Sequence, residues 1–231
     1  MTRQILMIDA DDTLWENNIY FERAIDRFIE VVAHPTFSPA EVRSAFDALE
    51  AERVKAHGYG TDAFHASLLA GFAHLTGAVC DQASAAEIEA CAMHVRGSEL
   101  VLLQDVAETL SQLAHNHTLF LVTKGDHAEQ TTKLVRSGLA KYFSQVEVLR
   151  EKNESAYLEL IRRHGLDPTQ TWMIGNSPRS DINPALAAGL HAVYLPHPST
   201  WVLEQEAIAT AADPQHLLEL ASFKDLLLYF E

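Results

Sequence analysis

The sequence predicts an α/β fold: a doubly wound parallel sheet with an all-helical domain inserted after the first strand. From about residue 98 onward, short apolar runs alternate with helical segments, which is typical of βαβ units and a parallel sheet. An earlier apolar run at residues 5–8 is followed by a stretch, about 16–97, that has no strand pattern. We therefore expect a core domain at 1–15 and 98–231 and a helical domain at 16–97.

The inserted domain is expected to contain four helices. Apolar residues recur at helical spacing over Ile19–Val32 and predict the first. The second is expected over Ser38–His57, because a serine followed by proline and, three positions on, glutamate is a helix start. We expect Thr61 to cap a third helix that ends near Leu75, and Ser84 to begin a fourth that ends near Val95.

The core domain is expected to contain five strands joined by helices. The strands are predicted at residues 5–8, 118–122, 146–149, 172–174 and 191–195, and the helices at 105–114, 126–138, 153–164 and 181–188. Crossovers between parallel strands are right-handed, and ligands bind beyond the carboxyl ends of the strands at the point where the strand order reverses. We therefore expect the functional site at this edge of the sheet.

Composition excludes several classes of protein. The formal net charge is −15 and no cluster of lysine and arginine occurs, which argues against binding nucleic acid or a membrane surface. The two cysteines, Cys80 and Cys91, are too few for a disulfide framework, and the histidines show no spacing typical of a metal site. No apolar run is long enough to span a bilayer and no secretory leader is apparent. We expect a cytoplasmic protein, either a monomer or a homodimer.

Polar residues follow four of the predicted strands. Asp9 and Asp11 follow the first, and their spacing of two places both carboxylates on one side of the chain. The second strand is followed by Thr123, Lys124 and Gly125, the third by Lys152, and the fourth by Gly175, Asn176, Ser177 and Asp181.

Each of these residues also has an ordinary structural interpretation. Thr123 and Asp181 are suited to capping helices, and a lone lysine such as Lys152 is most often solvated. Their coincidence at one edge favours chemistry, because two carboxylates, a hydroxyl, an ammonium and a glycine turn are the groups that phosphoryl transfer needs. Two carboxylates so close also either bind a divalent cation or divide into a nucleophile and an acid/base.

The chain resembles the haloacid dehalogenase-like (HAD) hydrolase superfamily, whose core is Rossmann-like. The resemblance lies in four segments in order: D-A-D-D-T around Asp9, L-V-T-K-G around Thr123, Lys152, and I-G-N-S-P-R-S-D ending at Asp181. The helical domain resembles the type 1 cap of that family, so core and cap together account for essentially the whole chain. The family implies a hydrolase of the phosphatase branch acting on a small phosphorylated metabolite.

The resemblance also implies roles for individual residues. Asp9 would attack phosphorus, Asp11 would act as acid and base, Thr123 and the Lys124 amide would bind phosphoryl oxygens, and Lys152 would balance charge. Mg²⁺ would be held by the Asp9 carboxylate, the Asp11 carbonyl oxygen and Asp181. Asn176 departs from the family, which usually has an aspartate there, so we expect weaker Mg²⁺ binding through that loop. The dehalogenases of the family lack the second aspartate, so the presence of Asp11 favours phosphate esters.

Substrate binding is expected to involve Lys124 and Gly125 in the core, with Trp15 at the hinge and Tyr59 at the tip of a glycine-flanked turn in the cap. Two alternatives remain open, and a third is disfavoured. A phosphomutase of the same family would share every core residue. A catalytically weak binding protein on this scaffold would be consistent with Asn176. A signalling receiver domain is disfavoured, because its phosphorylated aspartate would end a middle strand and the insertion makes the chain too long.

Overall fold

The computed structural model describes residues 3–209 and 216–230. Within them the chain divides into two compact units, a core unit of Met1–Asn18 and Leu100–Glu231 and a helical unit of Ile19–Glu99. These limits lie within three residues of the predicted domain boundaries, whose outer ends, 1 and 231, fall outside the described residues.

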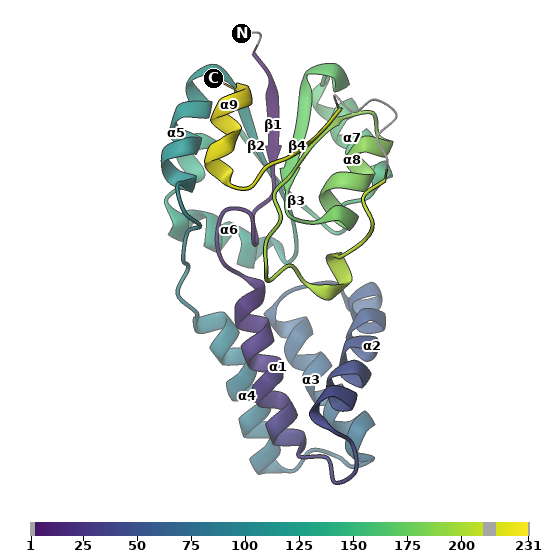
Figure 1. Cartoon of the computed structure of the whole chain (residues 1–231). Helices are drawn as coiled ribbons and strands as arrows, with labels where there is room; N and C mark the ends of the chain where they lie inside the picture. The colour runs from purple at the N-terminus through teal and green to yellow at the C-terminus, as the bar shows by residue number, and fades with distance from the viewer. Residues whose placement is uncertain (1–2, 210–215, 231) are drawn as a thin grey trace. The chain divides into compact units, whose positions relative to one another are not determined.

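The core unit contains one six-stranded parallel sheet in the order β3-β2-β1-β4-β5-β6 (Figure 1). The strands are β1 (Ile5–Ile8), β2 (Thr118–Lys124), β3 (Gln145–Leu149), β4 (Thr171–Gly175), β5 (His191–Tyr194) and β6 (Leu217–Glu219). The predicted doubly wound parallel sheet is thus confirmed. After β1 the order runs outward first through β2 and β3 and then, on the other side, through β4, so the switch point lies at β1.

Helices cover both faces of this sheet. They are α5 (Val106–Asn116), α6 (His127–Ser137), α7 (Glu154–His164), α8 (Asn183–Ala187) and α9 (Leu227–Phe230). Figure 1 shows α5 and α9 on one side of the strands and α7 and α8 on the other. Alternation along β1 explains the two layers, because Leu6 and Ile8 pack with α5 and α9 whereas Met7 packs with α7 and α8.

The helical unit consists of α1 (Asn18–Val32), α2 (Pro39–His57), α3 (Thr61–Thr76) and α4 (Gln82–Gly97). Phe28, Phe46 and Phe64 lie in its apolar core, and Phe46 packs against both other rings. The Ser38 side chain and Glu41 form the capping box that the sequence predicts. None of the described helices is long and apolar enough to cross a membrane.

Several predicted element ends were wrong. Gly60 stands at the N-cap of α3 without any side-chain cap, so Thr61 is the first helical residue and not the cap. Asp81 caps α4 by accepting the backbone N–H of Ser84, which places the helix start before Ser84. β6 was missed because three residues are too short to give a periodic signal. A π-helical turn over Pro178–Ile182 precedes α8, where the sequence predicted a single helix from Asp181.

Candidate active site

The predicted catalytic residues lie at the carboxyl ends of adjacent strands. Asp9 directly follows β1, and its backbone N–H donates to the Ile174 carbonyl oxygen of β4 at 2.9 Å. Thr123 is the penultimate residue of β2, the neighbour of β1 on its other side, and its side chain is buried. Strand ends at the switch point therefore deliver these groups to one edge.

Lys152, which follows β3, brings the two sides of this edge together. Its ammonium donates to Asp9 Oδ1 at 2.5 Å and also pairs with Asp181 Oδ1. Only 4% of the residue is exposed, so the interpretation of Lys152 as a solvated side chain is excluded. The structure thus places a carboxylate after β1 and a carboxylate after β4 on one shared cation.

One ammonium is not enough to compensate both carboxylates. Burial, reinforced by the charge of Asp181 and only partly offset by Lys152, raises the pKa of Asp9 to about 7. Burial likewise raises the pKa of Asp181, with Lys152 opposing. Burial would lower the pKa of Lys152, but the charges of Asp181 and Asp9 prevail and hold it well above its ordinary value. The ammonium stays charged, and one ammonium is too few to hold both buried carboxylates at their ordinary pKa values.

The loop after β4 is built tightly around Asp181. A side chain at Gly175 would place its Cβ 2.2 Å from Asp181 Oδ2, so only glycine lets this carboxylate lie against the strand end. The same oxygen accepts the Ser177 backbone N–H at 2.9 Å. Glycine and a backbone donor therefore fix Asp181 where it meets Lys152.

Asn176 faces the same region through its amide oxygen. Thr13 Oγ1 lies 3.2 Å from Asp9 Oδ2 and 3.3 Å from Asn176 Oδ1, within donor range of either. The Asn176 amide nitrogen donates to Thr200 Oγ1 at 2.9 Å, which fixes the oxygen toward Thr13. Sequence reasoning noted Thr13 only as part of the motif and missed Thr200.

Asp11 lies half-buried and is surrounded by donors. Trp15 Nε1 donates to Oδ1 at 2.6 Å, Gln130 Nε2 to Oδ2 at 2.8 Å, and Lys133 Nζ to both oxygens at 2.8 and 2.9 Å. Burial by itself would raise the pKa of Asp11, but Lys133, Gln130 and Trp15 together lower it below its ordinary value. Sequence reasoning missed Gln130 and Lys133, although their spacing of three places them on one face of a helix.

Lys124 ends β2, and its side chain is engaged by the protein itself. Its ammonium donates to Glu204 Oε1 at 2.5 Å and to Ser180 Oγ at 2.9 Å. Glu204 is buried and also accepts Ser177 Oγ at 2.6 Å. Gly125 follows with φ of 140°, a conformation that favours glycine. The Lys124 side chain therefore braces the loop after β4.

The two remaining residues assigned to substrate binding are placed differently. Trp15 is 1% exposed and packs in the core, and its indole N–H donates to Asp11, so its role in substrate binding stays a prediction. Tyr59 is half-buried in the turn between α2 and α3 of the helical unit, and its role stays a prediction.

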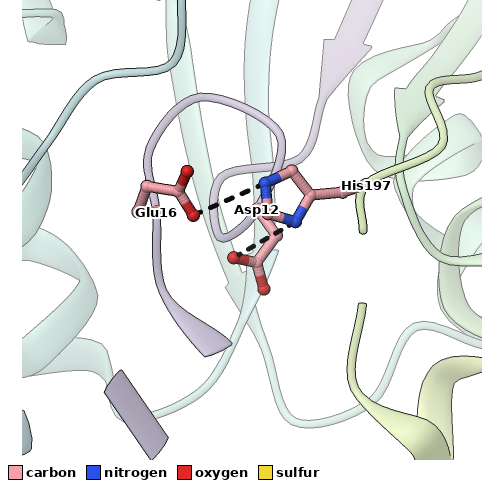
Figure 2. Close-up of side chains that lie close together, drawn as sticks. All are labelled: Asp12, Glu16 and His197. Carbon is pink, nitrogen blue, oxygen red and sulfur yellow. Dashed lines mark ion pairs between the residues drawn. The ribbon is translucent and has the colours of Figure 1, made fainter. Parts of the chain in front are cut away.

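A second polar cluster lies in the loop after Asp11 (Figure 2). The His197 ring lies between two carboxylates, with Nδ1 3.8 Å from Asp12 Oδ1 and Nε2 3.5 Å from Glu16 Oε2. Asp12 also accepts the backbone N–H groups of Asn17 and Asn18 at 2.9 and 3.1 Å. The three groups lie within 4.8 Å of one another, close enough to hold a cation. In the core unit these contacts fix the loop around His197 to the segment that follows β1.

Comparison with known proteins now identifies the family. The family model of haloacid dehalogenase-like hydrolases matches residues 4–189. This chain belongs to that family. A solved haloacid dehalogenase-like hydrolase from Xanthomonas campestris is 25% identical, with a TM-score of 0.83 over 99% of this chain and 94% of that one.

Curated relatives match over a shorter stretch. The pyrimidine 5'-nucleotidase PynA of Streptococcus pneumoniae is 32% identical over 139 residues, 57% of this chain and 54% of the relative. The N-acylneuraminate-9-phosphatase of Mus musculus is 25% identical over 136 residues, 57% of this chain and 52% of the relative. The chain thus spans about half the length of these curated relatives.

Proposed function

We propose that this chain is a Mg²⁺-dependent phosphatase that cleaves a small phosphate monoester through an aspartyl-phosphate on Asp9. The observation that carries the proposal is the buried bridge of Lys152 between Asp9 and Asp181, at the carboxyl ends of the strands in a chain of the haloacid dehalogenase-like hydrolase family. The named phosphatases among its relatives support the same reaction class. The carboxylates of Asp9 and Asp181, held by the Lys152 ammonium, suit a site that binds a phosphoryl group and a metal ion.

In the first step Asp9 is the nucleophile. A carboxylate oxygen of Asp9 attacks phosphorus, the bond from phosphorus to the ester oxygen breaks, and Asp11 gives that oxygen its proton. The charge of a bound phosphate beside Asp11 raises its pKa, which favours the protonated form in the complex. The Thr123 hydroxyl and the Lys124 backbone N–H donate to the phosphoryl oxygens, while Lys152 stabilises the charge that gathers around Asp9.

In the second step water replaces the alcohol. Asp11, now a carboxylate, removes a proton from the water that attacks the aspartyl-phosphate, and the bond from phosphorus to the Asp9 oxygen breaks. Free phosphate leaves and Asp9 is regenerated. The donors around Asp11, which lower its pKa in the free protein, suit it to accept this proton only transiently and to return to its charged form.

The residues present fit Mg²⁺. Asp9 and Asp181 have raised pKa values because burial and one shared ammonium leave negative charge uncompensated, and a cation would relieve it. Carboxylate, amide and carbonyl oxygens are the hard donors that Mg²⁺ prefers, so we assign Asp9, Asp181 and the Asp11 carbonyl oxygen as ligands, with Asn176 bonding a metal-bound water. When bound, Mg²⁺ would supply a Lewis acid for the phosphoryl oxygens.

The substrate we propose is a small phosphorylated metabolite. The two curated relatives are named for a nucleotide phosphate and a sugar-acid phosphate, both esters of small polar alcohols. The Tyr59 turn in the helical unit is the segment we propose for choosing among such esters.

The test is release of inorganic phosphate with and without Mg²⁺ from nucleoside 5'-monophosphates, sugar phosphates and sugar-acid phosphates. We expect Mg²⁺-dependent turnover, and a loss of at least about 10³-fold in kcat for Asp9→Asn. Near-wild-type turnover of Asp9→Asn would contradict the proposal. A phosphomutase would instead release little phosphate and need a bisphosphorylated activator, and a binding protein would turn over none of the panel.

A further inference from the structure

The Asp11 carboxylate accepts four hydrogen bonds, more than a side chain needs in order to transfer a proton. Each oxygen receives two donors: Trp15 and Lys133 on Oδ1, and Gln130 and Lys133 on Oδ2. The donors come from the segment after β1 and from α6. A carboxylate bonded on both oxygens from two elements has one orientation.

Lys133 is the centre of this arrangement. Its ammonium uses two N–H groups on Asp11 and the third on Asn17 Oδ1 at 2.7 Å, so all three donors are engaged. The side chain is 24% exposed, unlike solvated ion pairs that contribute little. Lys133 therefore fixes Asp11 and, through Asn17, the segment that leads from β1 to α1.

Gln130 lies three residues before Lys133 on α6. Its amide nitrogen donates to Asp11 Oδ2 at 2.8 Å and reaches the Lys124 carbonyl oxygen at 3.3 Å. The same amide thus touches the acid/base and the end of β2, where the phosphoryl-binding groups begin. One face of α6 connects these two parts of the site.

We propose that Lys133, with Gln130, is a positioning residue that aims Asp11 at the leaving oxygen of the substrate. The inference rests on the proposed function, in which Asp11 transfers that proton. Positioning of a general acid matters most when the leaving group is a poor one. An alkoxide must be protonated as it departs, whereas a nitrophenolate or a carboxylate leaves without a proton.

The activity test compares Lys133→Met with wild type on an alkyl phosphate, p-nitrophenyl phosphate and acetyl phosphate. In single-turnover measurements of the first step, we expect about 10- to 100-fold slower phosphorylation of Asp9 by the alkyl ester and little change for the other two substrates. The water step uses Asp11 with every substrate and should slow equally for all three. Lys133→Arg should recover part of the loss. In an Asp11→Asn background, Lys133→Met should add no further loss. Lys141→Met, a lysine that packs over the Tyr142 ring, is the matched control and should behave as wild type.

A second readout does not depend on turnover. The Trp15 indole N–H donates to Asp11, so its nitrogen–proton NMR signal, assigned by its loss in Trp15→Phe, reports the carboxylate directly. We expect that signal to shift in Lys133→Met and to stay in place in Lys141→Met. Equal slowing of Asp9 phosphorylation by all three substrates, or a Trp15 signal that Lys133→Met leaves in place, would overturn the positioning role. No wild-type turnover on any ester would overturn the proposed function, while the Trp15 signal would still report whether Lys133 holds Asp11.

Discussion

Two regions of the core unit hold their carboxylates in different ways. Asp11 has a lysine of its own and its pKa is lowered, whereas Asp9 and Asp181 share Lys152 and both pKa values are raised. All three carboxylates are largely buried within the same unit, so burial alone does not explain the difference. The lysine that Asp11 does not share, together with the N–H donors of Gln130 and Trp15, accounts for it. The region that is short of a cation is the one to which we assign Mg²⁺.

A third region extends the comparison. In the helical unit the guanidinium of Arg43 bonds to Glu22 and Asp47. Glu50 is 5% exposed and interacts with Arg43 only through the electrostatic attraction of its charge. Burial, with a contribution from Asp47, raises the pKa of Glu50 to about 7. A carboxylate without its own cation therefore shifts in the same direction in a unit that has no proposed catalytic role.

The first expected effect concerns the metal. Asp181→Ala should weaken Mg²⁺ binding by at least about 10- to 100-fold, since even residues outside the ligand shell change metal affinity that much. Asn176→Asp adds a carboxylate to the region already short of a cation and should tighten Mg²⁺. Calorimetric titration measures both. Unchanged affinity in both variants would mean that this loop does not face the metal.

The stability of the protein should depend on pH through the raised pKa of Asp9. Folded Asp9 binds its proton more tightly than the unfolded chain does, because burial raises its pKa from the ordinary 3.8 to about 7. Its contribution is therefore full below about pH 4 and is lost as pH rises to about 7, by a few kcal/mol at most. The Tm in EDTA should fall over this range, and Mg²⁺ should restore it at the upper end. A matched series on Asp9→Asn should be flatter; an equally steep fall there would assign the dependence to other groups.

Tyr59→Ala tests selectivity while leaving both carboxylate regions intact. If the turn between α2 and α3 contacts substrate, kcat/KM should fall by about 1–3 kcal/mol for the esters it touches and hardly at all for acetyl phosphate. Steady-state kinetics on the ester panel give the answer. A uniform loss on every substrate, or none, would remove Tyr59 from substrate selection.

The smallest effect is expected at Glu50. Glu50→Gln removes a buried charge, so it should stabilise the chain by about 1 kcal/mol above pH 7 and by progressively less toward pH 4.5. Activity should not change. Glu52→Gln is the control, because Glu52 is exposed and pairs with Lys55 on the surface, where such pairs contribute little. Equal effects of the two substitutions on Tm would contradict the account of Glu50.

The sequence predicts the position of a residue correctly where that residue lies at the end of a strand. Asp9 and Thr123 reach one edge because β1 and β2 are neighbours and parallel, and an apolar run followed by a polar residue reveals that. Sequence could not show that Trp15 turns inward, since a tryptophan after a strand suits either a cavity or the core.

Lys133 was missed for a different reason. Its spacing from Gln130 was visible, but which face of α6 meets Asp11 depends on how the helix packs against the sheet. His197 comes from a loop and Glu204 from the short 3₁₀ helix Val202–Glu204, which is too short to give a periodic signal. Contacts that depend on packing angle or on loop path are the ones that a single sequence leaves open.

The central claim is that Asp9 carries the phosphoryl group, and trapping it is the most direct test. Wild-type protein would be mixed with Mg²⁺ and radiolabelled acetyl phosphate, quenched in acid and digested. The account predicts label on the peptide that contains Asp9, released by hydroxylamine and absent from Asp9→Asn. Phosphate release without label on that peptide, or label that persists in Asp9→Asn, would contradict it.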